Sequence, residues 1–231
     1  MAKNHLKSLN TPKTWNILRK AQVFVTRPYP GQSSLLLGMP ISLILRDQLH
    51  IATTQKEVKY ILHQKEILAN NKVVCEPKYI VGFMDTLSVP KLKKHYRGFL
   101  TQKGKITFIE IPESEKDKKV CKIIGKKFYK GKTQINLYDG RNILVDKDSY
   151  TVGDSVLISI PQPKILDHFK LEKGAFIVLT GGKHVGQKGT IEHVDEQTLR
   201  YKRAGGEVYQ TDKKHAFVIG KHKEALTLPN S

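Results

Sequence analysis

The stretch GAFIVLTGGKHVGQKGTI, from Gly174 to Ile191, contains the strongest local signature in the chain. Apolar residues alternate before a glycine-rich loop, and a second β-prone run follows it, so the stretch predicts a strand, a loop and a strand. Glycines in such a loop allow a positive φ and let another backbone approach closely. The loop glycines are Gly182, Gly186 and Gly189, and the donors between them are Lys183, His184 and Lys188. We expect residues 171–231 to form a β unit around this loop.

Working outward, residues 91–170 lack helical periodicity and contain short β-prone runs separated by Gly, Asp and Lys turns. The runs are 105–111, 119–124, 133–137, 141–145 and 155–160. A spacing of about ten residues predicts a small antiparallel sheet or barrel. Asp139-Gly140 is its clearest turn. We expect a central β domain over residues 91–170.

Residues 35–90 predict a compact module of two short helices and a hairpin. Pro40 suits the first helical position of a helix that runs through Gln48. Thr54 and Glu57 have the spacing of a capping box that opens the second helix. The dipeptide Asn70-Asn71 between two β-prone pairs predicts a tight hairpin, and a strand over 79–89 follows.

Residues 1–34 have two proline-containing turns and too little periodic apolar content for a core. We expect an extended basic arm that is mobile in isolation and ordered on RNA. Its aromatic and cationic side chains are of the kinds that stack on bases and fill RNA grooves. An equally supported alternative is that Trp15 and Ile17 anchor the arm on the protein body.

The net charge of +19, with a sequence pI near 9.8, favours a polyanionic partner, first nucleic acid and second an anionic membrane surface. The excess is uneven: residues 1–46 hold seven Lys or Arg and no acid, and residues 91–130 hold thirteen against four. Residues 173–231 hold ten against six, whereas 47–90 and 131–172 are close to neutral. Three separate basic regions favour phosphates of RNA or DNA over one disordered tail.

Other classes of function find little support in the sequence. The most apolar stretch, 35–45, is much shorter than the about 20 residues that cross a bilayer. The two cysteines and nine histidines lack metal-ligand spacing. Neither a phosphate-binding loop in the correct register nor a catalytic triad can be found. We therefore expect no enzyme activity, cofactor, metal, small-molecule substrate or membrane partner.

Motifs from three regions resemble known families. The 174–191 stretch resembles a KOW motif, with Ala175 where an Asp is usual, and this implies an SH-three-like barrel. The segment 67–74, between a capped basic helix and 77–81, resembles the RNA-binding module named after ribosomal protein S-four. The run HLKSLNTPKTW at 5–15, GFMD at 82–85 and FVIGK at 217–221 resemble the e-type small-subunit ribosomal protein four family of archaea and eukaryotes. Ser8 departs from that family's usual Arg.

The resemblance covers nearly the whole chain in order. It implies an α+β, multi-domain fold: a basic arm, an S-four-like module, a central antiparallel β domain and a KOW barrel. It implies a cytoplasmic, archaeal-type structural constituent of the small ribosomal subunit, with small-subunit ribosomal RNA and neighbouring ribosomal proteins as partners. The alternative is a regulatory RNA-binding or transcription-elongation factor that uses the KOW barrel. The residues predicted to contact RNA are His5, Lys7, Lys13, Trp15, Arg19, Lys20, Arg27, Arg46, Lys56, Lys59, Lys72, Lys126, Lys127, Lys130, Lys183, His184 and Lys188.

Overall fold

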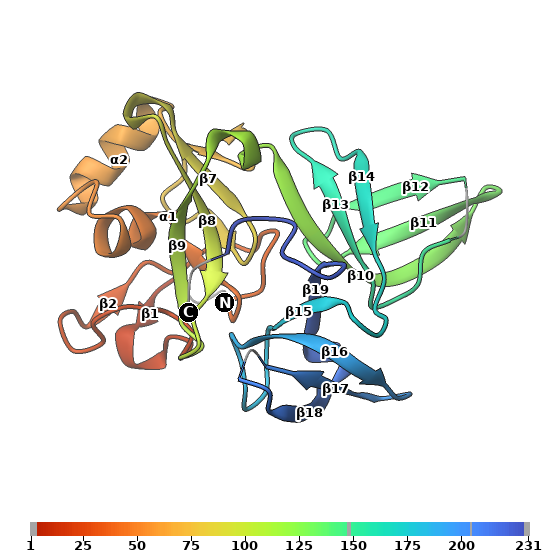
Figure 1. The fold of residues 1–231 in the computed structure, drawn as a ribbon. Coiled ribbons are helices and arrows are strands. Elements are labelled where there is room, and N and C mark those ends of the chain that lie inside the picture. The colour runs from red at the N-terminus through yellow and green to blue at the C-terminus, as the bar shows by residue number, and fades with distance from the viewer. Residues whose placement is uncertain (1–3, 147–148, 204, 229–231) are drawn as a thin grey trace. The chain divides into compact units, whose positions relative to one another are not determined.

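A computed structural model describes residues 4–146, 149–203 and 205–228, and shows a mostly β chain with few helices (Figure 1). The predictions for residues 1–3 of the arm, 147–148, 204 and the tail 229–231 lie outside the described residues. The chain forms two compact units. Unit 1 comprises residues 1–100 and 104–117, and unit 2 comprises 101–103 and 118–231.

The helices of unit 1 form where the sequence predicts them. Helix α1 (Ile41–Leu43) continues as a π-helical segment (Ile44–Gln48), and Pro40 stands one residue before α1 as its N-cap. Helix α2 (Gln55–His63) opens with the predicted capping box, in which the Thr54 side chain accepts from the Glu57 backbone N–H. These helices bury Ile41, Val58 and Leu62.

The sheet of unit 1 has the order β5-β4-β7-β8-β9, with every described neighbouring pair antiparallel. Its strands are β4 (Leu68–Ala69), β5 (Lys72–Val73), β7 (Thr86–Val89), β8 (Lys94–Leu100) and β9 (Ile106–Ile111). The predicted hairpin is confirmed: Asn70 and Asn71 both have a positive φ and join β4 to β5, as a type I′ turn requires. A separate pair joins β3 (Gly38–Pro40) to β6 (Ile80–Gly82).

Two predictions for this region are wrong. The single strand over 79–89 is two strands, β6 and β7. The chain turns between them at Met84, whose φ is 63°, and the Asp85 carboxylate accepts from the Gly82 N–H at 2.7 Å. The boundary between 90 and 91 cuts through one sheet, because β8 pairs with β7 along its length. Strand pairing across that boundary buries Phe99 and Leu100 in unit 1.

The prediction of an extended amino-terminal arm is also wrong for the described residues. Strands β1 (Leu6–Lys7) and β2 (Phe24–Val25) pair with each other. Trp15 is completely buried, and its indole N–H lies 2.8 Å from the Gly38 carbonyl oxygen. The Ile106 N–H donates to the Thr14 carbonyl at 2.7 Å, so the segment is attached to β9. Of the two alternatives for Trp15, anchoring on the protein body is correct.

Unit 2 contains two five-stranded antiparallel sheets. The central sheet has the order β12-β11-β10-β13-β14, and the carboxyl-terminal sheet has the order β18-β17-β16-β15-β19. The central strands are β10 (Lys118–Tyr129), β11 (Lys132–Leu137), β12 (Asn142–Val145), β13 (Ser155–Ser159) and β14 (Ile165–Phe169). The others are β15 (Phe176–Leu179), β16 (Lys188–Val194), β17 (Thr198–Lys202), β18 (Val208–Asp212) and β19 (Ala216–Gly220).

The central sheet has its own core of apolar side chains. Cys121, Ile123, Ile135, Leu137, Val156 and Ile158 are fully buried and form one cluster. Lys119 is buried beside it and donates to the Asp139 carboxylate at 2.9 Å. Pairing and hydrogen bonding are what make a buried charge tolerable. This lysine of the 91–130 excess is therefore used inside the fold and is not available to a partner.

Candidate nucleic-acid interface

The predicted cations of unit 1 divide into one converging group and several scattered ones. His5, Arg27, Arg46 and Lys59 line one hollow of about 400 Å³. Lys78, which the sequence analysis did not select, lines it as well. The remaining lining residues are Asn4, Gln22, Phe24, Val25, Thr26, Gln55 and Pro77, so no carboxylate is among them. We call this site the basic hollow.

Local structure positions the side chains of the basic hollow. Arg46 donates through Nε to Asp47 Oδ1 at 2.6 Å, and this hydrogen bond raises the pKa of Arg46 above its ordinary value. The His5 ring meets the Phe24 ring edge to face, with 5.5 Å between the centroids. Helix α2, held by its capping box, presents the exposed Lys59. A phosphate in the hollow would meet cations from separate segments on one concave surface.

The other predicted residues of unit 1 do not line this hollow. Lys7, Lys13, Lys20, Lys56 and Lys72 are exposed. Arg19 donates to the Pro12 carbonyl at 2.7 Å and so braces its own segment. The prediction that Trp15 contacts RNA is wrong, because no part of its side chain reaches the surface.

In unit 2 the β10–β11 hairpin places Lys126, Lys127 and Lys130 on the surface. Lys126 donates to the Tyr150 carbonyl at 3.0 Å, and the Lys130 ammonium lies 5.4 Å from the centroid of the Tyr129 ring. Phe128, which sequence reasoning missed, is 73% exposed between these lysines. The sequence pattern that could have identified it is the aromatic pair Phe128-Tyr129 with lysines on both sides.

The glycine-rich loop joins β15 to β16 as predicted. Gly182 and Gly186 have positive φ values of 81° and 78°. Gly189 lets another backbone approach closely, because a Cβ there would lie 2.6 Å from the Lys202 carbonyl oxygen. The two roles expected of these glycines are thus divided, the positive φ being found at Gly182 and Gly186 and the close approach at Gly189.

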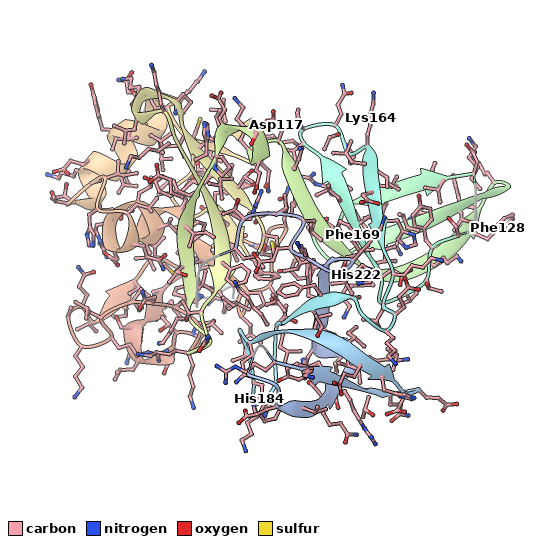
Figure 2. All side chains as sticks on the ribbon, in the orientation of Figure 1. Asp117, Phe128, Lys164, Phe169, His184 and His222 are labelled. Atoms are coloured by element: carbon pink, nitrogen blue, oxygen red, sulfur yellow. The ribbon has the colours of Figure 1, made fainter. Side chains whose placement is uncertain are left out.

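The donors of that loop have different surroundings. Lys183 is exposed, whereas His184, labelled in Figure 2, lies 4.6 Å from the Tyr209 ring between centroids. Lys188 lies 3.4 Å from Glu224. Lys188 also lines a hollow of about 710 Å³ together with Lys202, Arg203 and His222, three cationic or titratable residues that the sequence analysis did not select.

The described part of the chain contains neither a helix suited to a bilayer nor a cluster of metal-binding side chains. The longest helix found there is α2, with nine residues, and none reaches the length and apolarity that a bilayer requires. Within the same residues, no three His, Cys, Asp or Glu side chains lie together as a metal site would need.

Comparison with known proteins gives consistent matches over almost the full length. A family model described as Ribosomal family S4e matches residues 92–165, and one described as RS4NT (NUC023) domain matches residues 2–32. The small ribosomal subunit protein eS4 of Methanosphaera stadtmanae is 36% identical over 234 residues, covering 98% of this chain and 96% of that protein. The eS4 protein of Methanocella arvoryzae is 36% identical over 233 residues, covering 98% of both.

A solved structure supports the same assignment. The crystal structure of the 30S ribosomal protein S4e from Thermoplasma acidophilum matches with a TM-score of 0.70 and 29% identity, covering 80% of this chain and 96% of that one. The family to which the 5–15, 82–85 and 217–221 motifs point is therefore confirmed. This chain belongs to the S4e family of ribosomal proteins.

Proposed function

We propose that this protein is a structural constituent of the small ribosomal subunit in the cytoplasm, and that it binds small-subunit ribosomal RNA and neighbouring ribosomal proteins. Its relatives are named small ribosomal subunit proteins. Most contacts would be to phosphate and sugar, with RNA shape providing specificity. In this role the protein catalyses no reaction and uses no cofactor or small-molecule substrate.

The basic hollow carries the proposal for RNA binding. Its cations come from parts of the sequence as distant as His5 and Lys78, and the fold places them around one concavity without a carboxylate. A concave surface of one charge sign concentrates the electrostatic field and attracts polyanions. Scattered solubilising lysines would have no reason to converge in this way.

The finer architecture belongs to the same proposal. We infer that the α2 and β4–β5 region acts as an S-four-like RNA-binding module within an α+β, multi-domain chain. The carboxyl-terminal sheet would be an SH-three-like barrel with a KOW motif, supported by the conformations of Gly182 and Gly186. The exposed residues outside the hollow would add phosphate contacts; they are Lys7, Lys13, Lys20, Lys56, Lys72, Lys126, Lys127, Lys130 and Lys183.

A triple variant of the hollow tests the RNA-binding proposal directly. Replacing Arg27, Lys59 and Lys78 by Gln should weaken binding to small-subunit ribosomal RNA in filter-binding assays. Each lost phosphate contact should reduce the slope of log affinity against log salt by about one.

The matched control removes three charges that are already paired. Lys116, Lys214 and Lys221 each lie within ion-pair distance of an acidic side chain. Replacing these three by Gln should leave the affinity and the salt slope close to those of the unaltered protein. Equal losses in the two triple variants would show that only total charge matters, which would refute a specific role for the hollow.

Sedimentation of a cell lysate separates the ribosomal role from that of a regulatory or elongation factor. The protein should be recovered with small subunits after a wash at moderate salt. Recovery in the free fraction alone would overturn the ribosomal proposal.

A further inference from the structure

The tip of the β10–β11 hairpin extends beyond the stretch of β10 that pairs with β13. Strand β13 pairs with β10 only between Lys118 and Lys122. From Gly125 onward β10 pairs with β11 alone, up to the closing pair Tyr129 and Lys132. Figure 1 shows this hairpin as a long green ribbon whose tip lies away from β13 and β14.

The turn at the tip is built to be tight. Lys130 and Gly131 both have a positive φ, 48° and 78°, and a two-residue loop of this kind is a type I′ turn. Such a turn matches the twist of its strands and holds the residues before it in register. The ring of Phe128 is therefore presented from ordered β backbone, opposite Thr133.

Phe128 is the most exposed aromatic side chain among the described residues, at 73%, and the core cluster of the sheet does not include it. Figure 2 labels it at the outer end of the hairpin. Tyr129 beside it is 46% exposed and, by strand alternation, faces the opposite side of the ribbon. An ordered apolar ring that keeps most of its surface in solvent is available to a partner.

The charge around the ring identifies the kind of partner. Residues 125–131, at the tip, contain three lysines and no acidic residue. Lys127 and Lys130 adjoin the Phe128–Tyr129 pair in the chain, and neither forms an ion pair in the described part of the structure. By strand alternation Lys127 shares the Tyr129 side of the ribbon, and the Lys130 ammonium lies 5.4 Å from the centroid of the Tyr129 ring at the turn. An aromatic ring with adjacent cations is the combination that binds unpaired nucleotides, because the ring stacks on the base while the cations contact phosphates.

We propose that the β10–β11 tip is a stacking site for an unpaired nucleobase of RNA, with Phe128 as the platform on one side of the ribbon. Lys127 on the other side and Lys130 at the turn would contact the phosphates that flank the stacked nucleotide. This inference rests on the proposed RNA-binding function and adds a recognition element to it. A base inside a duplex has both faces covered by its neighbours, so the site selects looped, bulged or terminal nucleotides. A protein neighbour is less well matched, since the tip offers two isolated rings among lysines instead of a continuous apolar surface.

Fluorescence of a Phe128→Trp variant tests the stacking directly. The chain has a single tryptophan, Trp15, which is buried and supplies a constant background. Adding a single-stranded oligoribonucleotide should quench the new tryptophan, whereas a duplex with the same total phosphate concentration should not. Equal quenching by the two RNAs would overturn the proposal, and so would a lack of quenching while the single strand binds.

Affinity measurements on the full chain distinguish a stacked base from simple apolar contact. Phe128→Ala and Phe128→Leu should weaken binding to small-subunit ribosomal RNA by about 5- to 150-fold, whereas Phe128→Tyr should retain it. Leu166→Ala is the matched control, because Leu166 is also exposed, at 53%, on β14 of the same sheet. Retention by the Leu variant would indicate apolar contact and overturn base stacking.

The outcomes separate this inference from the function on which it rests. If the unaltered protein fails to bind the ribosomal RNA, the proposed function fails. If it binds and both the Ala and Leu variants bind equally well, only the stacking site is refuted. Binding of the unaltered protein to vesicles of anionic lipid that depends on Phe128, together with RNA binding that does not, would assign the tip to a membrane and refute the RNA site.

Discussion

Trp15 shows how one residue can attach a basic segment to a folded unit. Its ring is completely buried, and its N–H reaches two carbonyl oxygens, at 3.1 Å in Leu35 and 2.8 Å in Gly38. A buried indole needs such an acceptor, and losing the ring leaves both a cavity and unsatisfied carbonyls. The amino-terminal segment can therefore display its cations from a defined position.

We predict that Trp15→Ala destabilises unit 1 by about 3–5 kcal/mol, as expected for removal of a large buried side chain. Leu18→Ala should change stability by less than about 0.5 kcal/mol, because Leu18 is 84% exposed. Hydrogen exchange followed by mass spectrometry would locate the loss in peptides of unit 1. Unchanged protection of these peptides in the Trp15 variant would contradict the anchoring role.

Lys122 joins two parts of unit 2. Its ammonium donates to the carbonyl oxygens of Lys213, Lys214 and Ala216 at 3.1, 3.0 and 2.6 Å. Burial lowers the pKa of Lys122 from 10.5 to about 8. The charged form therefore costs desolvation in the folded protein that it does not cost in the unfolded chain.

This shift predicts a pH dependence of stability with a definite sign. Between pH 8 and 10.5 the unfolded chain keeps the Lys122 proton that the folded protein has released, so the contribution to stability rises with pH. The total gain is at most about 3 kcal/mol. The difference in unfolding free energy between the unaltered protein and Lys122→Met should therefore increase from pH 8 to pH 10 in chemical denaturation. A difference that falls over this range would contradict the prediction.

At the scale of elements, the loop between β15 and β16 depends on a close approach that a sequence pattern cannot specify. Gly186 has a φ of 78°, and a Cβ there would lie 1.9 Å from the Thr101 carbonyl oxygen. Gly131, at the β10–β11 turn, has the same φ, but a Cβ there would meet nothing within 4 Å. Both sites require the left-handed backbone conformation, but only Gly186 also lacks room for a side chain. Comparing substitutions at the two sites therefore distinguishes the cost of the conformation from the cost of the clash.

We expect Gly131→Ala to cost about 1–2 kcal/mol, the penalty of placing an L-residue in the left-handed region. Gly186→Ala has the same penalty and a backbone clash in addition, so its cost should exceed about 4 kcal/mol. Thermal unfolding of the two variants would show the difference. Equal shifts in the melting temperature of the two variants would mean that the β15–β16 loop relieves the clash with Thr101 without a loss of stability.

The elements that the sequence predicted well are those held by local interactions. The Thr54–Glu57 capping box and the Asn70-Asn71 turn each depend on a few consecutive residues, and both formed as expected. The boundary at 90 and the long strand over 79–89 failed because they depend on strand pairing. Whether β8 joins β7 is decided by distant apolar partners, which a single sequence does not identify.

At the scale of the whole molecule, the net charge of +19 is distributed over two units that each expose cations. In unit 1 several cations converge in the basic hollow. In unit 2 a group of exposed lysines lies at the β10–β11 tip. Some charges are used internally, as Lys119 with Asp139 shows. The number of cations available to a polyanion is therefore smaller than the count of basic residues.

Phosphate contacts release counterions, so affinity for RNA should fall steeply with salt. Five contacts, from Arg27, Lys59 and Lys78 in the hollow and Lys127 and Lys130 at the tip, predict a loss of at least about a hundredfold between about 50 and about 200 mM salt. Filter binding over that range with small-subunit ribosomal RNA provides the measurement. A loss of less than about tenfold would mean that these cations do not contact phosphate.

The sequence by itself determined the family, the uneven distribution of basic charge, the capped helix and the glycine-rich loop. These depend on motif order, on summed charge and on contacts between residues close in the chain. Only the tertiary structure decided that Trp15 is a buried anchor, that Lys119 is an internal ion-pair partner and that His5 and Lys78 share one hollow. The physical reason is that burial and convergence depend on packing between segments that are distant in the sequence. The sequence alone shows only which residues are close along the chain and what the overall composition and charge are.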